Sequence, residues 1–143
     1  MLVAGFGVVM WAQAQLTPPT AVPLLPRALL GGFVIALGWA LVSWGFLVFR
    51  EAQTTIDPVA IHTARALVTS GPFARTRNPM YVGFAMMLMG WAVVLGRVLT
   101  LVEPLLFVVF IDRFQVRPEE AAMRARFGDV YDGYASRVPR WLF

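Results

Sequence analysis

The stretch Ala28–Phe49, ALLGGFVIALGWALVSWGFLVF, decides the fold class of this chain, because it runs for about 22 residues without a charge. A helix of about 20 apolar residues is long enough to cross the hydrocarbon core of a bilayer. The charged pair Arg50-Glu51 ends the stretch. The sequence therefore predicts a membrane-spanning helix over residues 28–49.

The composition of the whole chain fits a membrane protein better than a soluble domain. Of its 143 residues, 59% are hydrophobic and 14% are charged, and the apolar residues fall in blocks. All twelve basic residues are arginine, and the net charge is +4. The arginines flank the apolar blocks, which indicates membrane orientation and headgroup contact rather than binding of nucleic acid.

The rarest residue types exclude several kinds of chemistry. The chain has no cysteine and one histidine, His62. Without cysteine there is no disulfide, no thiolate nucleophile and no Cys-based metal site. One histidine is too few for a conventional multi-histidine metal site. We therefore expect no bound metal.

Further apolar segments predict an all-α integral membrane bundle of about four transmembrane helices. The expected spans are residues 2–16, 28–49, 80–95 and 98–112. The last two are short and form a hairpin around Gly96-Arg97, so they either stop short of crossing or thin the bilayer locally. The first span contains Ala12-Gln13-Ala14, which resembles a signal-peptidase site, but no positive segment precedes it and we favour its retention.

The distribution of arginine predicts the orientation of these spans. Four arginines lie between the second and third spans and six follow the fourth, whereas the other connections hold Arg27 and Arg97. The positive-inside rule places residues 50–79 and 113–143, a C-terminal helix and tail, in the cytoplasm. We expect one multi-pass domain over residues 1–143 in the inner, or cytoplasmic, membrane.

Two polar motifs in the predicted cytoplasmic segments are candidates for carrying chemistry. The first is Leu67–Gly83, LVTSGPFARTRNPMYVG, and the second is Glu119–Pro139, EEAAMRARFGDVYDGYASRVP. Asn78-Pro79 is a favoured helix start, with Asn as the N-cap and Pro at the first helical position. The free N–H groups of that helix end could anchor a polar or anionic ligand group, although a capped helix without a ligand explains the same residues.

The second motif predicts a helix over Pro118–Phe127 with Gly128 as its stop. Glu119 and Glu120 would lie in its first turn, where acidic side chains are favourable without any ligand. One of these carboxylates could instead bind hydroxyls or a cationic group of a cofactor. The two side chains point in different directions on a helix, so we expect them to have different roles.

Four arginines near the motifs have two explanations. Arg75 and Arg77 precede a predicted span, and Arg113 and Arg117 lie four residues apart where the last span ends. Contact with lipid headgroups explains all four. Arg113 and Arg117 could also fix an anionic group of a substrate.

Together the motifs resemble the isoprenylcysteine carboxyl methyltransferase family, which groups with phospholipid N-methyltransferases. The resemblance covers more than half of the chain at fixed spacing, and it implies an integral membrane enzyme that uses S-adenosylmethionine. The cofactor contacts that it implies are Arg65, Ala66, Leu67, Val68, Phe73, Asn78, Pro79, Met80, Tyr81, Glu119 and Glu120.

Three positions depart from the family pattern. Asn78 stands where the family usually has His, and Phe73 replaces a Tyr. Gln115 occupies the place of a substrate-binding Arg in the eukaryotic members. This last change argues against a prenylcysteine carboxylate as the substrate unless Arg113 or Arg117 takes over the contact.

Methyl transfer needs positioning more than acid–base groups, because a carboxylate or thiolate nucleophile is already ionised. We expect an S-adenosylmethionine-dependent methyltransferase that acts on a lipophilic carboxylate, thiol or amine at the cytoplasmic face. Its expected catalytic residues are Tyr81, Arg113 and Arg117, and its expected partners are the lipophilic substrate and membrane lipids. The alternatives are a non-catalytic membrane module that binds lipid or a partner, and a sterol-reductase-like NADPH oxidoreductase.

Overall fold

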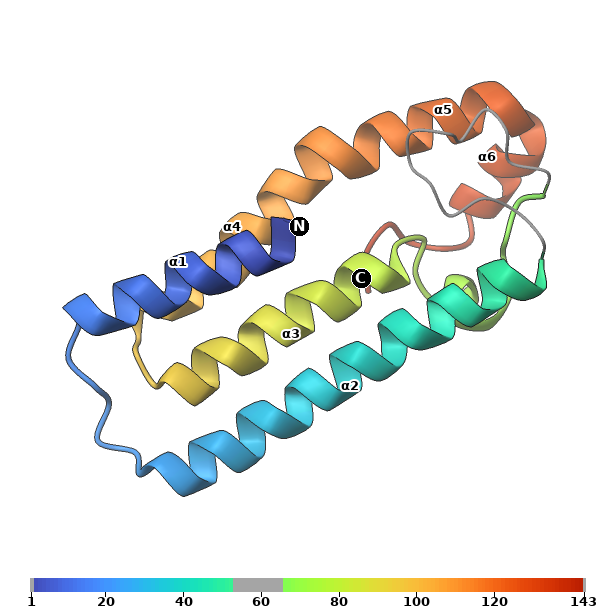
Figure 1. The fold of residues 1–143 in the computed structure, drawn as a ribbon. Coiled ribbons are helices and arrows are strands. Elements are labelled where there is room, and N and C mark those ends of the chain that lie inside the picture. The colour runs from blue at the N-terminus through green and yellow to red at the C-terminus, as the bar shows by residue number, and fades with distance from the viewer. Residues whose placement is uncertain (1, 53–65, 143) are drawn as a thin grey trace. The chain divides into compact units, whose positions relative to one another are not determined.

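The computed structural model describes residues 2–52 and 66–142, and every regular element in those residues is a helix (Figure 1). The predicted all-α class is therefore confirmed for this part of the chain. The elements are α1 Leu2–Leu16, α2 Leu24–Glu51, the 3-10 helix η2 Gly71–Ala74, α3 Pro79–Leu95, the 3-10 helix η3 Leu99–Leu101, α4 Val102–Ile111, the π-helix η4 Asp112–Val116, α5 Arg117–Phe127 and α6 Asp129–Ala135.

The predicted span 28–49 is part of α2, which has 28 residues from Leu24 to Glu51. At 1.5 Å per residue this helix is about 42 Å long, more than a bilayer core requires. It exposes large apolar side chains, among them Phe33, Leu37 and Trp39, instead of burying them. That pattern is expected for contact with lipid. Within the described residues α2 alone is long and apolar enough to span a membrane, and the shorter α1 and α3 are also apolar, so the four-span topology stays a prediction.

The chain divides into two compact units. Unit 1 comprises Met1–Ala40 and Gly83–Val109, and unit 2 comprises Leu41–Val82 and Phe110–Phe143. Both units draw on α2, α3 and α4, because the division falls inside these helices. The expectation of a single domain over residues 1–143 stays a prediction.

In unit 1, two pairs of glycines let α2 and α3 pack backbone against backbone (Figure 1). A Cβ added to Gly31 would lie 2.4 Å from the carbonyl oxygen of Gly90, and one added to Gly38 would lie 2.5 Å from that of Gly83. Only glycine permits so close an approach of two helices. The glycines are spaced by seven residues in each helix, so both pairs fall on facing sides.

The turn predicted at Gly96-Arg97 is confirmed, since α3 ends one residue earlier and Gly96 has a φ of +61°. A left-handed φ of this kind favours glycine. Arg27 closes over the turn and donates from Nη1 to the carbonyl oxygen of Leu95 at 2.9 Å. This bond satisfies one of the free carbonyls at the C-terminus of α3.

In unit 2, the short helix η2 places Phe73 against α2. The ring of Phe73 meets that of Phe49 edge to face, with the ring centroids 5.0 Å apart. The hydroxyl of Tyr134 donates to the backbone carbonyl of Phe73 at 2.8 Å. Tyr131, Tyr134 and Val138 form a buried cluster on the other side. The first motif is therefore packed between α2 and the C-terminal segment.

The helix predicted over Pro118–Phe127 is confirmed as α5, which begins one residue earlier, at Arg117, but it is not preceded by a loop. In the structure α4, η4 and α5 follow one another without a break from Val102 to Phe127. Pro118 would normally interrupt such a helix, because its ring clashes with the carbonyl four residues earlier. The π-turn immediately before it changes the hydrogen-bond register, as the Arg117 N–H bonds to the Asp112 carbonyl.

Glu119 and Glu120 lie in the first turn of α5, as predicted, and this turn continues the helix before it. Glu119 and Glu120 do not follow a free helix N-terminus, because helical residues precede them for more than a turn. The stop at Gly128 is confirmed: it has a φ of +52° and its N–H bonds to the carbonyl of Arg124. A further short helix, α6, then begins at Asp129, which the sequence pattern had not indicated.

Candidate functional site

Helix α3 begins within the first motif, at Pro79 directly after Asn78, as predicted. The backbone N–H of Asn78 donates to Oγ1 of Thr76 at 3.2 Å, and its carbonyl accepts from the N–H of Val82 at 3.0 Å. Its side-chain nitrogen Nδ2 donates to the carbonyl oxygen of Arg140 at 3.0 Å. The Asn78 amide thus ties the start of α3 to the C-terminal tail, and its predicted capping role stays a prediction.

Tyr81, in the first turn of α3, points its hydroxyl at Glu119 of α5. The hydroxyl donates to Oε1 of Glu119 at 2.7 Å. The amide of Gln115, one helical turn before Glu119, donates to the same oxygen. The structure therefore brings together one residue of each motif, with Gln115 as a third member.

The Glu119 carboxylate is unusual in having uncharged partners. Burial raises the pKa of Glu119, and the hydrogen bonds from Gln115 and Tyr81 oppose that rise only in part. Across residues 2–52 and 66–142, no arginine forms an ion pair with it. The cluster of Tyr81, Gln115 and Glu119 therefore carries a negative charge that the described protein leaves without a positive partner.

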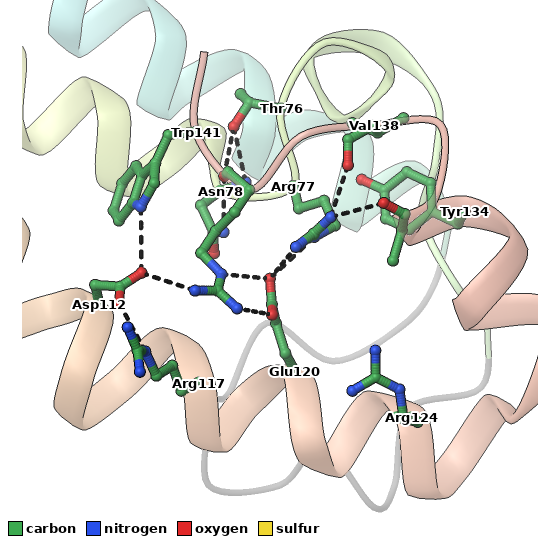
Figure 2. A network of polar contacts seen from close by, with 12 residues as sticks. Thr76, Arg77, Asn78, Asp112, Arg117, Glu120, Arg124, Tyr134, Val138 and Trp141 are labelled. Carbon is green, nitrogen blue, oxygen red and sulfur yellow. Dashed lines mark hydrogen bonds and ion pairs between the residues drawn. The ribbon is translucent and has the colours of Figure 1, made fainter. Parts of the chain in front are cut away.

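Glu120, the next residue, has the opposite environment. Nε and Nη2 of Arg77 contact its Oε1 at 2.9 and 2.8 Å, and Nη2 of Arg140 contacts its Oε2 at 2.6 Å. Figure 2 shows the carboxylate within this network. Burial alone would raise the pKa of Glu120, but the hydrogen bonds from Arg140 and Arg77 outweigh it and lower the pKa. The prediction that the two glutamates differ in role agrees with these contacts.

Arg77 has a structural role that the headgroup explanation missed. Besides Glu120, its Nη1 donates to the backbone carbonyls of Ala135 at 2.9 Å and Val138 at 2.7 Å (Figure 2). Its own N–H donates to the carbonyl of Pro139 at 3.0 Å. Arg77 therefore joins the first motif to the end of the second, and its assignment to lipid headgroups is wrong.

Asp112, in the π-turn, gathers a second set of donors. Its Oδ1 accepts from Nη1 of Arg140 and from the indole Nε1 of Trp141, both at 3.2 Å. Its Oδ2 accepts from Nε of Arg117 at 2.8 Å. The Arg117 pair joins residues five apart, which is the spacing that a π-turn brings together. Arg113, which is exposed, is not among these donors to Asp112.

The remaining predicted cofactor residues divide by environment. Phe73 and Met80 face α2: Phe73 packs on Phe49, and Met80 lies against Gly45. Leu67 packs on the tyrosine cluster of unit 2. Two further hydrophobic or small positions, Val68 and Pro79, are buried, and Ala66 is exposed. The prediction for Arg65 lies outside the described residues.

Three residues of the network, Arg77, Asp112 and Arg140, were not among the predicted site residues. Arg77 lies directly before Asn78-Pro79, and its place next to two predicted site residues could have marked it as a candidate. Asp112 was a weaker candidate: an acid at the end of a predicted span needs a polar partner or water, but the sequence does not say which. Arg140 could not be paired from the sequence, because its partners lie 20 and 28 residues away.

Comparison with known proteins agrees with the resemblance of the two motifs. A family model described as phospholipid methyltransferase matches residues 26–130. The chain is 38% identical over 76 residues to a protein-S-isoprenylcysteine O-methyltransferase of Schizosaccharomyces pombe. That match covers 51% of this chain and 31% of the yeast protein, so less than a third of the yeast protein has a counterpart here.

A second relative is shorter. An uncharacterized protein of Haemophilus influenzae is 35% identical over 63 residues, which are 44% of this chain and 100% of that protein. No solved structure gives a significant match. The two named similarities therefore rest on sequence, and the contacts described above come from this chain alone.

Proposed function

The chain belongs to the phospholipid methyltransferase family, and we propose that it is a membrane-embedded enzyme that uses S-adenosylmethionine to methylate a lipophilic acceptor at the cytoplasmic face. Family membership supports methyl transfer in a membrane. What we propose beyond the family is that the methyl donor is S-adenosylmethionine, that the acceptor is lipophilic, and that the reaction takes place at the cytoplasmic face. The names of the relatives favour an acceptor with a long hydrocarbon part.

The observation that carries the proposal is the Glu119 carboxylate at the meeting point of the two motifs. It is partly buried, it accepts hydrogen bonds from Tyr81 and Gln115, and no described arginine neutralises it. S-adenosylmethionine offers a sulfonium, an ammonium and ribose hydroxyls. A carboxylate in surroundings of low dielectric constant binds such cations and donors more strongly than one in water. The residues present therefore fit this cofactor.

When bound, S-adenosylmethionine supplies a methyl group on a positively charged sulfur. The residues of this chain would contribute by binding and orientation. Glu119 would hold the cofactor through charge or hydroxyl contacts, and the Tyr81 hydroxyl would fix the direction of that carboxylate. Both residues would position the cofactor, so neither needs to exchange a proton with a carboxylate or thiolate acceptor.

The wider set of contacts rests on the family resemblance. Arg113 and the outer side of Arg117 are proposed to meet the polar group of the acceptor, since both are exposed. Glu120 is better explained as a structural residue, because two arginines occupy its oxygens. The proposed cofactor contacts are Arg65, Ala66, Leu67, Val68, Asn78, Pro79, Tyr81 and Glu119.

The test is methyl transfer from labelled S-adenosylmethionine in membranes that contain the protein. We expect label in a product that partitions into organic solvent, and mass spectrometry of that product identifies the acceptor. Membranes with the same amount of Glu119→Gln protein are the matched control and should transfer much less. If the purified protein shows no saturable binding of S-adenosylmethionine, the proposal fails. Binding of NADPH would then indicate a reductase, and binding of neither would indicate a non-catalytic module.

Tyr81→Phe tests the proposed orienting role separately. The substitution removes one hydroxyl and leaves the ring in place. Glu119 then loses one of its two described hydrogen bonds, so binding of S-adenosylmethionine should weaken as well. Loss of one hydrogen bond to a charged group costs about 1.5–3 kcal/mol, and we expect kcat to fall by roughly tenfold or more. A wild-type kcat in Tyr81→Phe would remove Tyr81 from the catalytic residues.

A further inference from the structure

Arg140, in unit 2, lies just after the second motif and contacts both motifs. Its backbone carbonyl accepts from Oγ1 of Thr76 at 2.9 Å and from Nδ2 of Asn78 at 3.0 Å. Its guanidinium reaches two carboxylates, Glu120 and Asp112. One residue of the C-terminal tail is therefore bound to the start of α3 by its main chain and to the helix α4–η4–α5 by its side chain.

The geometry of the guanidinium suits a bridge between two acids. Nε and Nη2 of Arg140 contact Oε1 and Oε2 of Glu120 at 3.1 and 2.6 Å, which is a two-pronged contact. Nη1 contacts Oδ1 of Asp112 at 3.2 Å. A planar guanidinium can serve both acids at once because its donors point in fixed directions. The contacts raise the pKa of Arg140, first through its hydrogen bond with Glu120. The guanidinium of Arg140 therefore stays positively charged at any ordinary pH.

The bridge lies next to the proposed cofactor contacts. Glu120 is the neighbour of Glu119, and Asn78 lies three residues before Tyr81. The hydrogen bond between Tyr81 and Glu119 spans the same two elements, α3 and α5, that Arg140 connects through the tail. A small shift of α5 relative to the start of α3 would break that 2.7 Å bond.

We infer that Arg140 is a positioning residue of the methyl-donor site, and that the C-terminal tail is a functional part of the site. Through its contacts with Glu120, Asp112 and Asn78, Arg140 keeps α5 close to the start of α3. It thereby holds Glu119 and Tyr81 at hydrogen-bonding distance. This inference rests on the proposed function for its effect on catalysis. The tie between the tail and α5 can be tested without any activity.

The decisive variants are Arg140→Ala and Arg140→Lys, with Arg137→Ala as the matched control. Arg137 is an exposed arginine three residues earlier, and its described side-chain contact is a hydrogen bond to the carbonyl of Gly133, four residues before it. Arg140→Ala should raise the KM for S-adenosylmethionine at least fivefold and, because it loosens the bond between Tyr81 and Glu119, should also lower kcat. Lysine restores the charge without the two-pronged contact, so Arg140→Lys should recover thermal stability more fully than it recovers KM.

Two results would overturn the inference. One is a wild-type KM for folded Arg140→Ala protein, and the other is full recovery of KM in Arg140→Lys, which would show that charge alone suffices. The first result would reduce Arg140 to a structural residue even if the yield of folded protein falls. The KM is measured on the monodisperse fraction, so that a poorly folding variant does not mimic the expected effect.

A distance measurement separates this inference from the proposed function. The chain has no cysteine, so spin labels at Ala121→Cys on α5 and Leu142→Cys in the tail report their separation cleanly; both positions are exposed. We expect one narrow distance distribution in the otherwise unchanged chain and in Arg137→Ala, and a broad one in Arg140→Ala. If Arg140→Ala leaves the distribution narrow, the tail does not depend on the bridge, whatever the enzyme assay shows. If the wild type transfers no methyl group but the distribution broadens in Arg140→Ala, the proposed function is wrong. The structural link between the tail and α5 through Arg140 is then still supported.

Discussion

Glu119 and Glu120 show how two identical neighbours acquire different chemistry from their partners. Glu119 meets a phenol and an amide, and its pKa is raised by burial. Glu120 meets two arginines, and its pKa is lowered despite burial. The side chains diverge because adjacent helical positions lie on different faces of the helix. A partly buried anion without a cationic partner among residues 2–52 and 66–142 is costly to that part of the fold, so Glu119 is the member of the pair that a ligand with a positive charge would stabilise.

Glu119→Gln should weaken binding of S-adenosylmethionine by roughly tenfold or more at neutral pH, the size expected for a hydrogen bond to a charged group. The raised pKa of Glu119 adds a pH dependence. Wild-type affinity should fall as the pH drops through that pKa, and so at a higher pH than for an ordinary glutamate. The variant should lack this dependence. Calorimetry on detergent-solubilised protein measures both, with Asp129→Asn at an exposed acid as control. Equal affinities for Glu119→Gln and wild type would remove Glu119 from the site.

Glu120 leads to a prediction about stability in acid. Its pKa in the folded protein is lower than in the unfolded chain, where an ordinary glutamate titrates near pH 4.3. The ionised carboxylate therefore stabilises the fold above about pH 4.3, and this contribution is lost as the pH falls through the lowered folded pKa. Glu120→Gln should be less stable at neutral pH by about 2 kcal/mol, less than for a fully buried pair because Arg140 is partly exposed to solvent.

Unfolding of Glu120→Gln in a denaturant series between neutral and acid pH measures both effects. The difference from wild type should shrink as the pH falls. Asp132→Asn removes an exposed ion pair, with Arg124, and should change stability little at any pH. A stability difference for Glu120→Gln that stays constant down to low pH would contradict the assigned direction of the pKa.

At the scale of elements, the packing of α2 on α3 depends on glycine at particular positions rather than on glycine content. Gly31 faces α3, and an added Cβ would lie 2.4 Å from a backbone oxygen there. Gly32 is the next residue on the same helix, and an added Cβ would have no atom within 4 Å. The two positions therefore form a pair in which the chemical change is identical and the surroundings differ.

Gly31→Ala should destabilise the protein by about 1–3 kcal/mol, because a carbonyl of α3 cannot move aside without moving the helix. Gly32→Ala should be neutral or stabilising by up to about 1 kcal/mol, because alanine has the higher helix propensity. Unfolding of the purified variants in a denaturing detergent series measures the difference. If both variants have the same stability, the close approach of α2 and α3 is not a feature of the folded protein.

The π-turn is the element that the sequence analysis could least anticipate. Pro118 signals a helix boundary when the chain is read locally, and that local signal led to a predicted start at this residue. The structure passes Pro118 by widening the preceding turn. The same turn brings Asp112 next to Arg117, and both Asp112 and Gln115, which lie within it, contact site residues. A π-turn is common at functional sites, and here it supplies the acid that Arg140 bridges.

For the whole molecule, the open prediction is the topology. The positive-inside rule places the tail in the cytoplasm and the turn after α3 on the other side. Single cysteines at Ser136 and Val98 test this, since both positions are exposed and the chain has no cysteine. A membrane-impermeant maleimide should label Ser136→Cys only from the cytoplasmic side and Val98→Cys only from the opposite side. Labelling of both from one side would exclude the four-span arrangement.

The sequence by itself determined those features that depend only on neighbouring residues. The uncharged run of α2 marks an apolar helix, Asn78-Pro79 marks the start of α3, and Gly128 marks the end of α5, where the chain needs a left-handed φ. Each depends on local charge, capping or backbone freedom. The paired motifs also identified the family, because their spacing along the chain can be compared directly.

The contacts that only the tertiary structure decided join residues far apart in the chain. Arg77 and Glu120 are 43 residues apart, and Asn78 and Arg140 are 62 apart. Helix α6 belongs with them, since its tyrosines are held by burial and by a bond to Phe73 rather than by helix propensity. An arginine near a membrane has many possible acids in the sequence. Folding decides which acids pair with it, one for Arg77 and two for Arg140, because a partly buried charge must find a partner within a few ångströms.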